Sequence, residues 1–284
     1  MPAGVMVFII LLLLGTLLYF VLVRRQGALS PAAEPPPIAA TGAGEVSGPL
    51  VTENGIVFGG LPRASAGYPV TVLRNIAYIS GYSDARRDPL YVCYHVIATE
   101  HPFRLPRPTG NFVTDTRTRA RTTHDDFTGS GFDRGHMAPN AAIAHCFGAD
   151  AQHETFLLSN ICPQSPNLNE RVWDKLEARE VPYADKSGEV WVTDGPIFAD
   201  LNGGAARTLR SGIAVPAAFY KILVERTGGR VRVFSVIMPQ SVRGTELPGP
   251  FLSSIAEIEK ETGLTFLPEV AEGASLKGKV WPMW

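Results

Sequence analysis

The sequence of 284 residues is poor in cysteine and has no excess of positive charge. Its three cysteines, Cys93, Cys146 and Cys162, show no Cys-x-x-Cys spacing, and one would be left over if two paired. This pattern excludes a disulfide framework and a cysteine-ligated zinc site. The formal net charge of −1 excludes binding of a polyanion by bulk electrostatics, so any such affinity must come from a local basic surface.

Lysine is also scarce, with six residues against twenty arginines. Five arginines lie close together in the chain: Arg104, Arg107, Arg117, Arg119 and Arg121. A loop that follows the phosphates of a polyanion would use such a cluster, because a guanidinium can donate two parallel hydrogen bonds to one phosphate. A solvated loop whose arginines pair with Asp115, Asp125 and Asp126 would show the same pattern. A GC-rich coding sequence would raise the arginine count without any functional cause.

A long hydrophobic run covers residues 5–23, with Gly15 and Thr16 as its interruptions. As a helix it would span roughly 28 Å, about the thickness of the hydrocarbon core of a bilayer. A cleaved signal peptide is the alternative, but residues 1–4 hold no Lys or Arg and no cleavage site follows directly. We therefore expect residues 1–25 to form a transmembrane anchor or uncleaved signal, followed by a Pro/Ala/Gly-rich linker over residues 26–50.

Strand-like runs alternate with few helical stretches from residue 51 to 270. Strands are expected at residues 70–73, 76–80, 91–97, 156–159, 190–193, 218–224 and 231–238. Helices are expected at residues 149–154, 168–179 and 251–262, the second ended by Pro182 and the third by Gly263. The pattern predicts an α+β domain with a central, mainly antiparallel sheet flanked by helices, and residues 271–284 are expected to form a tail.

The segment Asp133-Arg134-Gly135-His136 joins several chemical capacities within four residues. His136 can act as a general base, because a histidine pKa of about 6.5 leaves the ring neutral at working pH. A hydrogen-bonded residue in a turn is the alternative. Arg134 would neutralise a phosphate as charge builds on its oxygens, or it forms a surface salt bridge. Asp133 would orient a neighbouring side chain or stabilise the turn, and Gly135 lets the backbone approach a substrate closely.

Asn169, Trp173 and Glu177 follow at a spacing of four residues on a stretch typical of a helix. They drift about 80° around the axis and about 12 Å along it, so they share one face. Asn169 can present its amide oxygen to Mg²⁺, which needs few protein ligands, or it can cap the helix. Glu177 would hydrogen-bond a metal-bound water. Base, phosphate clamp and metal ligand together indicate a metal-dependent phosphodiesterase.

These two segments, with Ser-Asn-Ile-Cys-Pro-Gln at residues 159–164, resemble the DNA/RNA non-specific endonucleases of the ββα-metal class, and within it the mitochondrial members. The similarity covers roughly residues 51–270 and includes residues 58–62, 192–198, 215–221 and 255–264. The resemblance implies a ββα-metal core on a central sheet. It also implies one asparagine-bound Mg²⁺ or Mn²⁺ ion and hydrolysis of single- and double-stranded DNA and RNA to 5′-phosphate and 3′-hydroxyl ends.

The resemblance also implies a role for individual residues. It assigns the general base to His136 and the metal ligand to Asn169. The water-holding carboxylate falls on Glu177 and the phosphate-stabilising arginine on Arg134. A further catalytic arginine of the family precedes a Phe-x-x-Asp signature and matches Arg107. Further substrate contacts are expected from Asp133, Arg117 and Arg119.

We therefore predict a membrane-tethered, metal-dependent endonuclease that hydrolyses DNA and RNA. Water deprotonated by His136 would attack phosphorus in line, with the metal on Asn169 steadying the leaving 3′-oxygen. Two alternatives stay open: a non-catalytic nucleic-acid-binding protein on the same scaffold, and a phosphodiesterase for small nucleotides. The resemblance leaves two protein partners open, a second copy of the chain in a homodimer and an inhibitor protein.

Two arguments disagree on which side of the membrane the nuclease domain lies. Arg24 and Arg25 follow the apolar run, and the positive-inside tendency would keep the rest of the chain in the cytoplasm. A nuclease that is freely active beside the chromosome would be harmful. We therefore expect the nuclease domain on the exported side (periplasmic, extracellular or intermembrane), against the charge rule.

Overall fold

The computed structural model describes residues 44–45, 51–65, 68–227, 230–270 and 276–277. The expected anchor over residues 1–25 lies outside these ranges, as do most of the expected linker and most of the expected tail. Within the described ranges, no helix combines the length and the apolar character needed to cross a membrane. The described elements all belong to one unit, which begins at Ala43.

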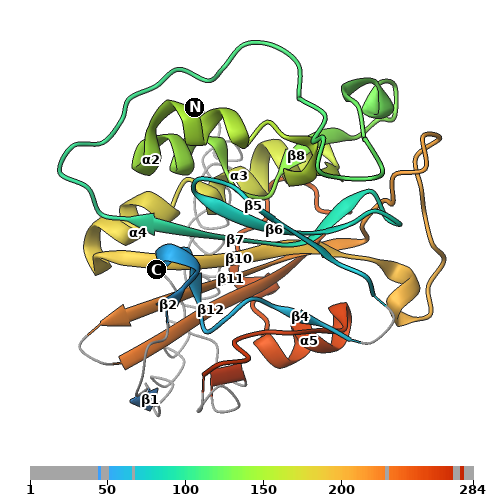
Figure 1. The fold of residues 1–284 in the computed structure, drawn as a ribbon. Helices are drawn as coiled ribbons and strands as arrows, with labels where there is room; N and C mark the ends of the chain where they lie inside the picture. The colour runs from blue at the N-terminus through green and yellow to red at the C-terminus, as the bar shows by residue number, and fades with distance from the viewer. Residues whose placement is uncertain (1–43, 46–50, 66–67, 228–229, 271–275, 278–284) are drawn as a thin grey trace, which may run out of the picture. The chain divides into compact units, whose positions relative to one another are not determined.

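A seven-stranded sheet forms the centre of this unit (Figure 1). Its strands run in the order β1, β12, β11, β10, β7, β6, β5, and every neighbouring pair is antiparallel. The strands are β1 (Gly44–Glu45), β5 (Thr71–Arg74), β6 (Tyr78–Ser83), β7 (Asp88–Ile97), β10 (Glu189–Ile197), β11 (Ala218–Thr227) and β12 (Arg230–Pro239).

Both faces of this sheet are covered, as the residues of β7 show. Val92 and Tyr94 pack in one apolar cluster, while Tyr91 and Cys93 pack in the other, because successive side chains of a strand point to opposite faces. Helix α5 (Ile255–Thr262) covers the second face (Figure 1). The helices over the first face are α2 (Asn140–Glu154), α3 (Asp174–Glu177) and α4 (Glu180–Ser187). The predicted α+β class with an antiparallel central sheet is confirmed.

One helix prediction is wrong in its start. Helix α2 begins at Asn140 rather than at residue 149, and Gly148 interrupts its helical backbone with a φ of 83°. The second helix, predicted over residues 168–179, is found over residues 168–177; it ends before Pro182, which lies in the first turn of the next helix, α4. A proline is tolerated there, since the first-turn N–H groups have no partner within the helix.

The third predicted helix is shorter than expected, but its end is confirmed. Ser254 caps α5 through a capping box with Glu257, so residues 251–254 lie before the helix. Gly263 ends it in the left-handed conformation at a φ of 68°, as predicted.

Six of the seven predicted strands overlap β5, β6, β7, β10, β11 and β12, although the first two were predicted to begin one and two residues too early, and the seventh is wrong. Residues 156–159 lead instead into a short helix, η3 (Leu158–Asn160). The Asn160 side chain accepts a hydrogen bond from Ala138 N at 2.8 Å and donates one to Ala138 O at 3.0 Å. The buried apolar residues therefore belong to a turn that joins α2 to the strand after it.

The remaining short elements connect these layers. They are β2 (Val51–Thr52), η1 (Glu53–Gly55), β3 (Val57–Phe58), β4 (Arg63–Ala64), η2 (His124–Phe127), η5 (Ala199–Asn202), η6 (Gly249–Phe251) and β13 (Leu264–Thr265).

Candidate active site

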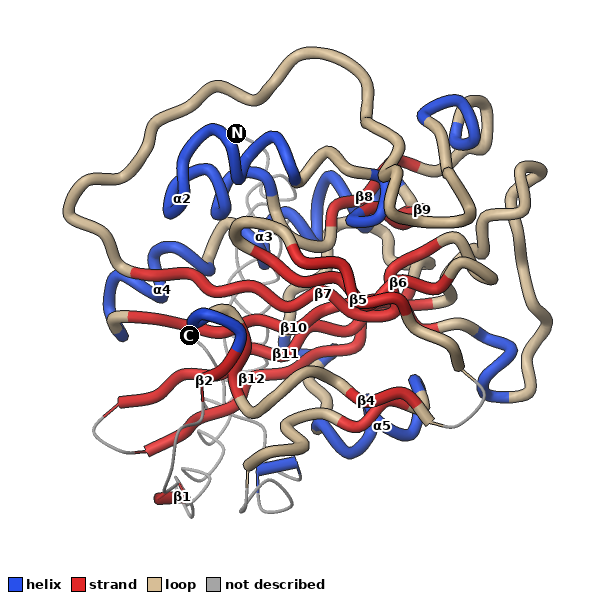
Figure 2. Tube along the Cα trace, viewed as in Figure 1, coloured by secondary structure: helices blue, strands red, loops and turns tan. Residues whose placement is uncertain are grey.

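A separate two-stranded sheet and the helix that follows it carry the two sequence motifs (Figure 2). Strand β8 (Asp133–His136) pairs antiparallel with β9 (Ile161–Gln164), and His136 lies opposite Ile161. The chain then enters η4 (Leu168–Trp173), a stretch of π-helix that continues directly into α3. Two strands and a helix thus form a ββα unit. A π-helical turn is rare and is often found at functional sites.

Strand β8 requires a glycine at position 135, because a side chain of the paired strand β9 approaches closely there. A Cβ atom added to Gly135 would lie 2.0 Å from Oε1 of Gln164, whose side chain is fully buried. Any other residue would push Gln164 away and displace β8 from β9. The glycine before His136 is therefore explained by strand packing.

Strand β8 and the η4–α3 helix border a cleft of about 620 Å³. The loop after β7, helix α2, strand β8 and the η4–α3 helix contribute its walls. The lining residues are Phe103, Arg104, Leu105, Arg107, Arg134, His136, Asn140, Ala141, Ala144, His145, Gln152, Asn169, Glu170, Asp174 and Glu177. Five predicted site residues therefore meet here, namely Arg107, Arg134, His136, Asn169 and Glu177.

His136 lies in an aromatic surrounding that keeps it uncharged. The ring is 5.3 Å from the ring of Phe112 and 5.4 Å, edge to face, from that of Phe156. Burial, assisted by the positive charge of Arg107, lowers the pKa of His136 to about 3. Its Nε2 is buried without a hydrogen-bond partner among the described residues, so Nδ1 is the nitrogen that can be reached from the cleft. The neutral ring is a base at pH 7.

Asn169 of η4 is oriented by a hydrogen bond to Asp133 of β8. Its Nδ2 donates to Oδ2 of Asp133 at 3.0 Å. A carboxylate can accept a hydrogen bond only from the nitrogen of the amide, so this contact leaves the amide oxygen of Asn169 free. Asp133 thus has the orienting role that the sequence suggested, and Asn169 presents an oxygen at the cleft.

Glu177 lies at the end of the same helix, above a buried cation. Its Oε1 is buried and has no hydrogen-bond partner in the described part of the chain. Burial raises the pKa of Glu177 well above its usual value, and the positive charge of Lys221 opposes this shift. Burial, which favours the protonated form of the carboxyl group, outweighs the attraction of Lys221, which favours the carboxylate.

Lys221 on β11 belongs to an ion cluster that the sequence did not reveal as part of the site. Its Nζ lies 2.7 Å from Glu180 Oε1 and 2.9 Å from Asp194 Oδ2, and all three side chains are fully buried. Nζ also lies 4.8 Å from the ring centre of Trp173 in η4. Burial lowers the pKa of Lys221, but the two carboxylates outweigh it and hold the pKa above its usual value. The signal in the sequence was a lysine inside an apolar strand.

Arg134 reaches the cleft from β8 and is held by the helix η2. One of its terminal nitrogens, Nη2, donates to the carbonyl of His124 at 2.8 Å and to Oγ1 of Thr128 at 3.3 Å. Its guanidinium lies 5.6 Å from the ring centre of Phe127. The arginine is therefore directed by the backbone of η2 rather than by a carboxylate, which leaves its charge available to an anionic ligand.

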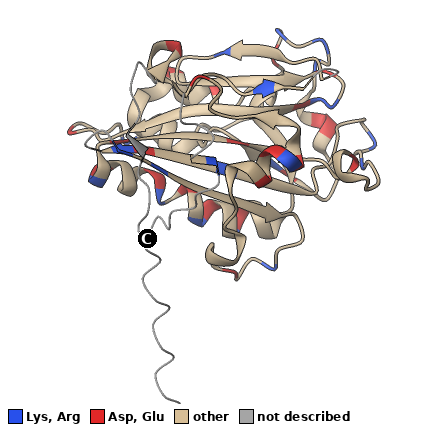
Figure 3. Ribbon diagram, turned by 90° about the horizontal axis from the view of Figure 1, so that it is seen from below, with Lys and Arg blue, Asp and Glu red and all other residues tan. Residues whose placement is uncertain are grey.

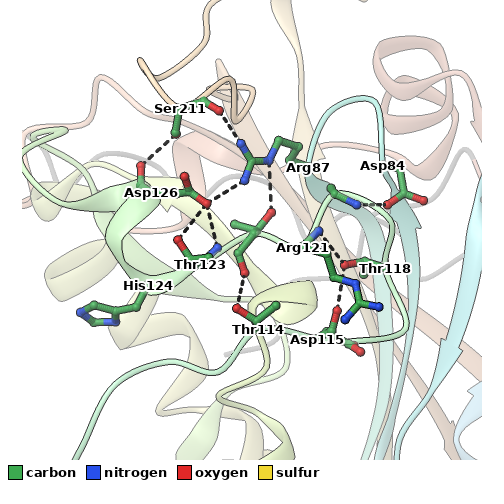
Figure 4. Close-up of polar contacts among 12 residues, drawn as sticks. Asp84, Arg87, Thr114, Asp115, Thr118, Arg121, Thr123, His124, Asp126 and Ser211 are labelled. Atoms are coloured by element: carbon green, nitrogen blue, oxygen red, sulfur yellow. Dashed lines mark hydrogen bonds and ion pairs between the residues drawn. The ribbon is translucent and has the colours of Figure 1, made fainter.

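Helix η2 is in turn fastened to the central sheet by Arg87, which the sequence reasoning also missed. Figure 4 shows its guanidinium between Ser211 and Asp126. Nη2 of Arg87 lies 2.7 Å from Oδ2 of Asp126, and Nη1 donates to the carbonyl of Ser211. The same Asp126 oxygen accepts from the backbone nitrogen of Thr123 at 2.7 Å, within the capping box of η2.

The five clustered arginines divide into different environments. Arg104 and Arg107 line the cleft, whereas Arg117 and Arg119 do not. Arg117 lies 2.7 Å from Asp115, as the solvated-loop alternative predicted, and donates to the carbonyl of Arg74 at 2.8 Å. The backbone nitrogen of Arg119 donates to Asp84. In the ribbon of Figure 3, basic and acidic residues are interspersed along the described elements.

The acidic residues of the cleft and the basic residues of the loop after β7 come from different elements. Arg104 and Arg107 come from the loop after β7, while Glu170, Asp174 and Glu177 come from the η4–α3 helix. Among the residues described, no group of three or more His, Cys, Asp or Glu side chains is placed to hold a metal ion together. The oxygen-bearing side of the cleft is therefore built around the amide of Asn169.

Comparison with known proteins decides the family. The DNA/RNA non-specific endonuclease family matches residues 62–273. The chain belongs to this family. It is 36% identical over 167 residues to mitochondrial endonuclease G of Bos taurus, a match that covers 55% of each chain. It is 29% identical over 232 residues to the mitochondrial nuclease EXOG of Xenopus laevis, over 76% of this chain and 64% of that one.

The fold of this DNA/RNA non-specific endonuclease family member is also found in a solved structure, the EndoG/EndoGI complex. The two superpose with a TM-score of 0.61 at 24% identity, over 71% of this chain and 87% of the other. The match to the bovine relative spans about half of that protein's length. Similarity to the mitochondrial members, expected from the sequence motifs, is confirmed.

Proposed function

We propose that this chain is a metal-dependent endonuclease that hydrolyses phosphodiester bonds in both DNA and RNA. The observation that supports this most strongly is the meeting of a neutral histidine, a free arginine charge and a free amide oxygen in one cleft. His136, Arg134 and Asn169 come from β8 and η4, and each is oriented by contacts that do not use its reactive atom. Family membership supports the same reaction class.

His136 begins the reaction as general base. Water within reach of Nδ1 loses its proton to the ring and attacks phosphorus in line with the leaving 3′-oxygen. Because burial and Arg107 lower the pKa of His136, its ring is uncharged before the reaction begins. Arg134 and Arg107 share the negative charge that builds on the phosphate oxygens, since both line the cleft. Contacts of this kind go to phosphate and do not select the sugar.

A divalent cation fits the opposite side of the cleft. The free amide oxygen of Asn169 would hold Mg²⁺ or Mn²⁺, and the unpartnered Oε1 of Glu177 would accept hydrogen bonds beside it. When bound, the ion would supply positive charge near the scissile phosphate. Asp133 would keep the Asn169 oxygen turned toward that ion.

The test uses purified protein with supercoiled plasmid and with RNA, each in Mg²⁺ and in chelator. We expect both polymers to be cut only with the metal, and His136→Ala and Asn169→Ala each to lose at least about 100-fold in rate. The matched control is His153→Ala, an exposed histidine of α2 that does not line the cleft. Tight binding of both polymers without cleavage by the unaltered protein would refute the proposal in favour of a binding protein.

Cleavage of small nucleotides alone, without salt-dependent action on long polymers, would favour a phosphodiesterase for small substrates instead. The membrane anchor, the exported location, the homodimer and the inhibitor protein stay predictions from the sequence.

A further inference from the structure

The loop after β7 crosses α2 and forms one rim of the cleft. Residues 98–111, here called the strap, leave the end of β7 and pass around α2 before the chain returns toward β8 (Figure 1). The sequence motifs give no role to its Phe103, which lines the cleft and is 51% exposed. It is unusual for a large aromatic side chain that lines a cleft to leave half of its surface exposed to solvent.

The strap is fixed to α2 on both sides of its exposed residues. The backbone nitrogen of Phe103 donates to the carbonyl of His145 at 3.1 Å. The buried side chain of Gln152 donates to the carbonyl of Pro106 at 3.1 Å. Residues 103–106 are thus held at their two ends, so the aromatic ring is presented from a defined backbone.

The ring of Phe103 rests on a position where the helix has no side chain. A Cβ atom added to Gly148 would lie 3.4 Å from the Phe103 ring, and Gly148 has a φ of 83°. The ring therefore has backbone support on one side and stays open on the other. Phe103 does not complete the hydrophobic core, since it is absent from the buried clusters of the described residues.

Basic groups connect this ring to the proposed general base. The Arg107 guanidinium lies 5.3 Å from the ring centre of Phe156, and Phe156 contacts His136 edge to face. Arg104 lies in the strap between Phe103 and Arg107 and also lines the cleft. A nucleic-acid strand with its scissile phosphate at His136 would therefore lie in a cleft that Arg104, Arg107 and Phe103 also line.

The other side of the cleft disfavours a second phosphate backbone. Glu170 and Asp174 line it and are both exposed. Their negative charges attract cations and repel phosphates, whereas the strap attracts phosphates. One strand can keep to the basic side, but a duplex would bring its second backbone toward the carboxylates.

The geometry points to Phe103 as a stacking platform for an unpaired nucleobase beside the scissile phosphate, which makes single-stranded nucleic acid the preferred substrate class. This inference rests on the proposed nuclease function. Stacking suits an enzyme without sequence preference, because every base has a face that can stack on an aromatic ring. A paired base inside a duplex already stacks on its neighbours and cannot use the platform.

The experiment compares kcat/KM of the full chain on one labelled oligonucleotide, offered single-stranded and as a duplex. We expect the unaltered protein to prefer the single strand. Phe103→Ala should lose about tenfold or more on the single strand and little on the duplex, while Phe103→Trp should keep the preference. Tyr68→Ala is the matched control, because Tyr68 is an exposed aromatic residue, 37% accessible, outside the cleft.

A second readout tests stacking without cleavage. In chelator, a single-stranded oligonucleotide should quench the added fluorescence of Phe103→Trp, measured against the unaltered protein with its four native tryptophans. Equal losses of Phe103→Ala on both substrates, or no loss on either, would overturn the inference while leaving the nuclease function intact. If the unaltered protein cuts neither substrate, the proposed function fails, and the quenching measurement still decides whether Phe103 stacks on bases.

Discussion

Replacing Arg87 with methionine should weaken catalysis through Arg134, although Arg87 does not line the cleft. Arg87 lies at the turn between β6 and β7 and donates to Asp126 Oδ2 at 2.7 Å. The same oxygen accepts from the backbone nitrogen of Thr123, which begins η2. The His124 carbonyl of η2 accepts from Arg134 at 2.8 Å. The central sheet is thereby linked to the catalytic arginine through three hydrogen bonds.

The size of the effect follows from the exposure of the pair. The side chains of Arg87 and Asp126 are 20% and 23% exposed, so the pair is partly screened by solvent. A hydrogen bond between charged groups contributes about 1.5–3 kcal/mol when shielded, and we expect the free energy of unfolding to fall by about 1–2 kcal/mol. Methionine keeps an unbranched side chain at the φ of 60° that Arg87 adopts, so the turn is no more strained. Helix η2 keeps its own capping box but loses its anchor.

A misplacement of a catalytic group by 1 Å can cost about 100-fold in rate, so Arg87→Met should reduce kcat/KM by about ten- to a hundredfold. The assay is a double-mutant cycle on one oligonucleotide with Arg87→Met, Arg134→Ala and the double variant. If Arg87 acts through Arg134, the double variant should be no slower than Arg134→Ala alone. Arg87→Lys, which keeps one hydrogen bond and the charge, should restore part of the rate.

The neighbouring residue of the same turn provides the control. Arg86 pairs with Asp200 at 2.9 Å and does not reach η2. Arg86→Met should therefore lower stability slightly and leave kcat/KM within about twofold. A double variant of Arg87 and Arg134 whose loss equals the product of the two single losses would refute the reasoning, because the two residues would then act independently.

Three further predictions follow from the buried charges of the site. Lys221→Met should lower the free energy of unfolding, measured in urea at pH 8, by about 3–5 kcal/mol, because it leaves two buried carboxylates without a counter-ion. The control Lys277→Met removes a more exposed ion pair and should lower it by less than about 1 kcal/mol. An effect of Lys221→Met as small as that of the control would contradict the prediction. The pKa of about 3 for His136 lies below the unfolded value, so the unfolded chain binds an extra proton on acidification. Between pH 7 and pH 5, the free energy of unfolding of the unaltered protein should then fall by about 2 kcal/mol more than that of His136→Phe. If the two proteins lost stability in parallel, the pKa of His136 would not be lowered in the folded state. Asp133→Ala should raise the Mg²⁺ concentration for half-maximal activity by about tenfold or more, and an unchanged requirement would remove Asp133 as the residue that orients Asn169.

The parts of the fold that could be predicted are those written in local patterns. The alternating apolar residues of the long strands and the glycine after α5 depend only on neighbours in the chain, and the structure bears them out. Pro182 was read as the residue that ends the second helix, but the effect of a proline depends on its position within a helix. A proline in the interior would have ended the helix, but the actual start at Glu180 makes it harmless.

The candidate site divides in the same way. His136 and Asn169 belong to one continuous ββα segment, so their motifs could be recognised without knowing the sheet order. Lys221 is joined to Asp194 and Glu180 only because β10 and β11 are paired and α4 packs against them, and no spacing in the sequence encodes that contact. Arg87 was missed for the same reason, because its partner lies 39 residues away in the chain.

The ββα segment supplies the side chains proposed to react, but their charge states depend on residues outside this segment. Burial and the positive charge of Arg107 of the strap keep His136 neutral, whereas burial raises the pKa of Glu177 well above its usual value and Lys221 of β11 only partly opposes that shift. The same low-dielectric surroundings therefore favour the uncharged form of both groups. The charge states of the two side chains thus depend on the loop after β7 and on the central sheet as well as on the ββα segment.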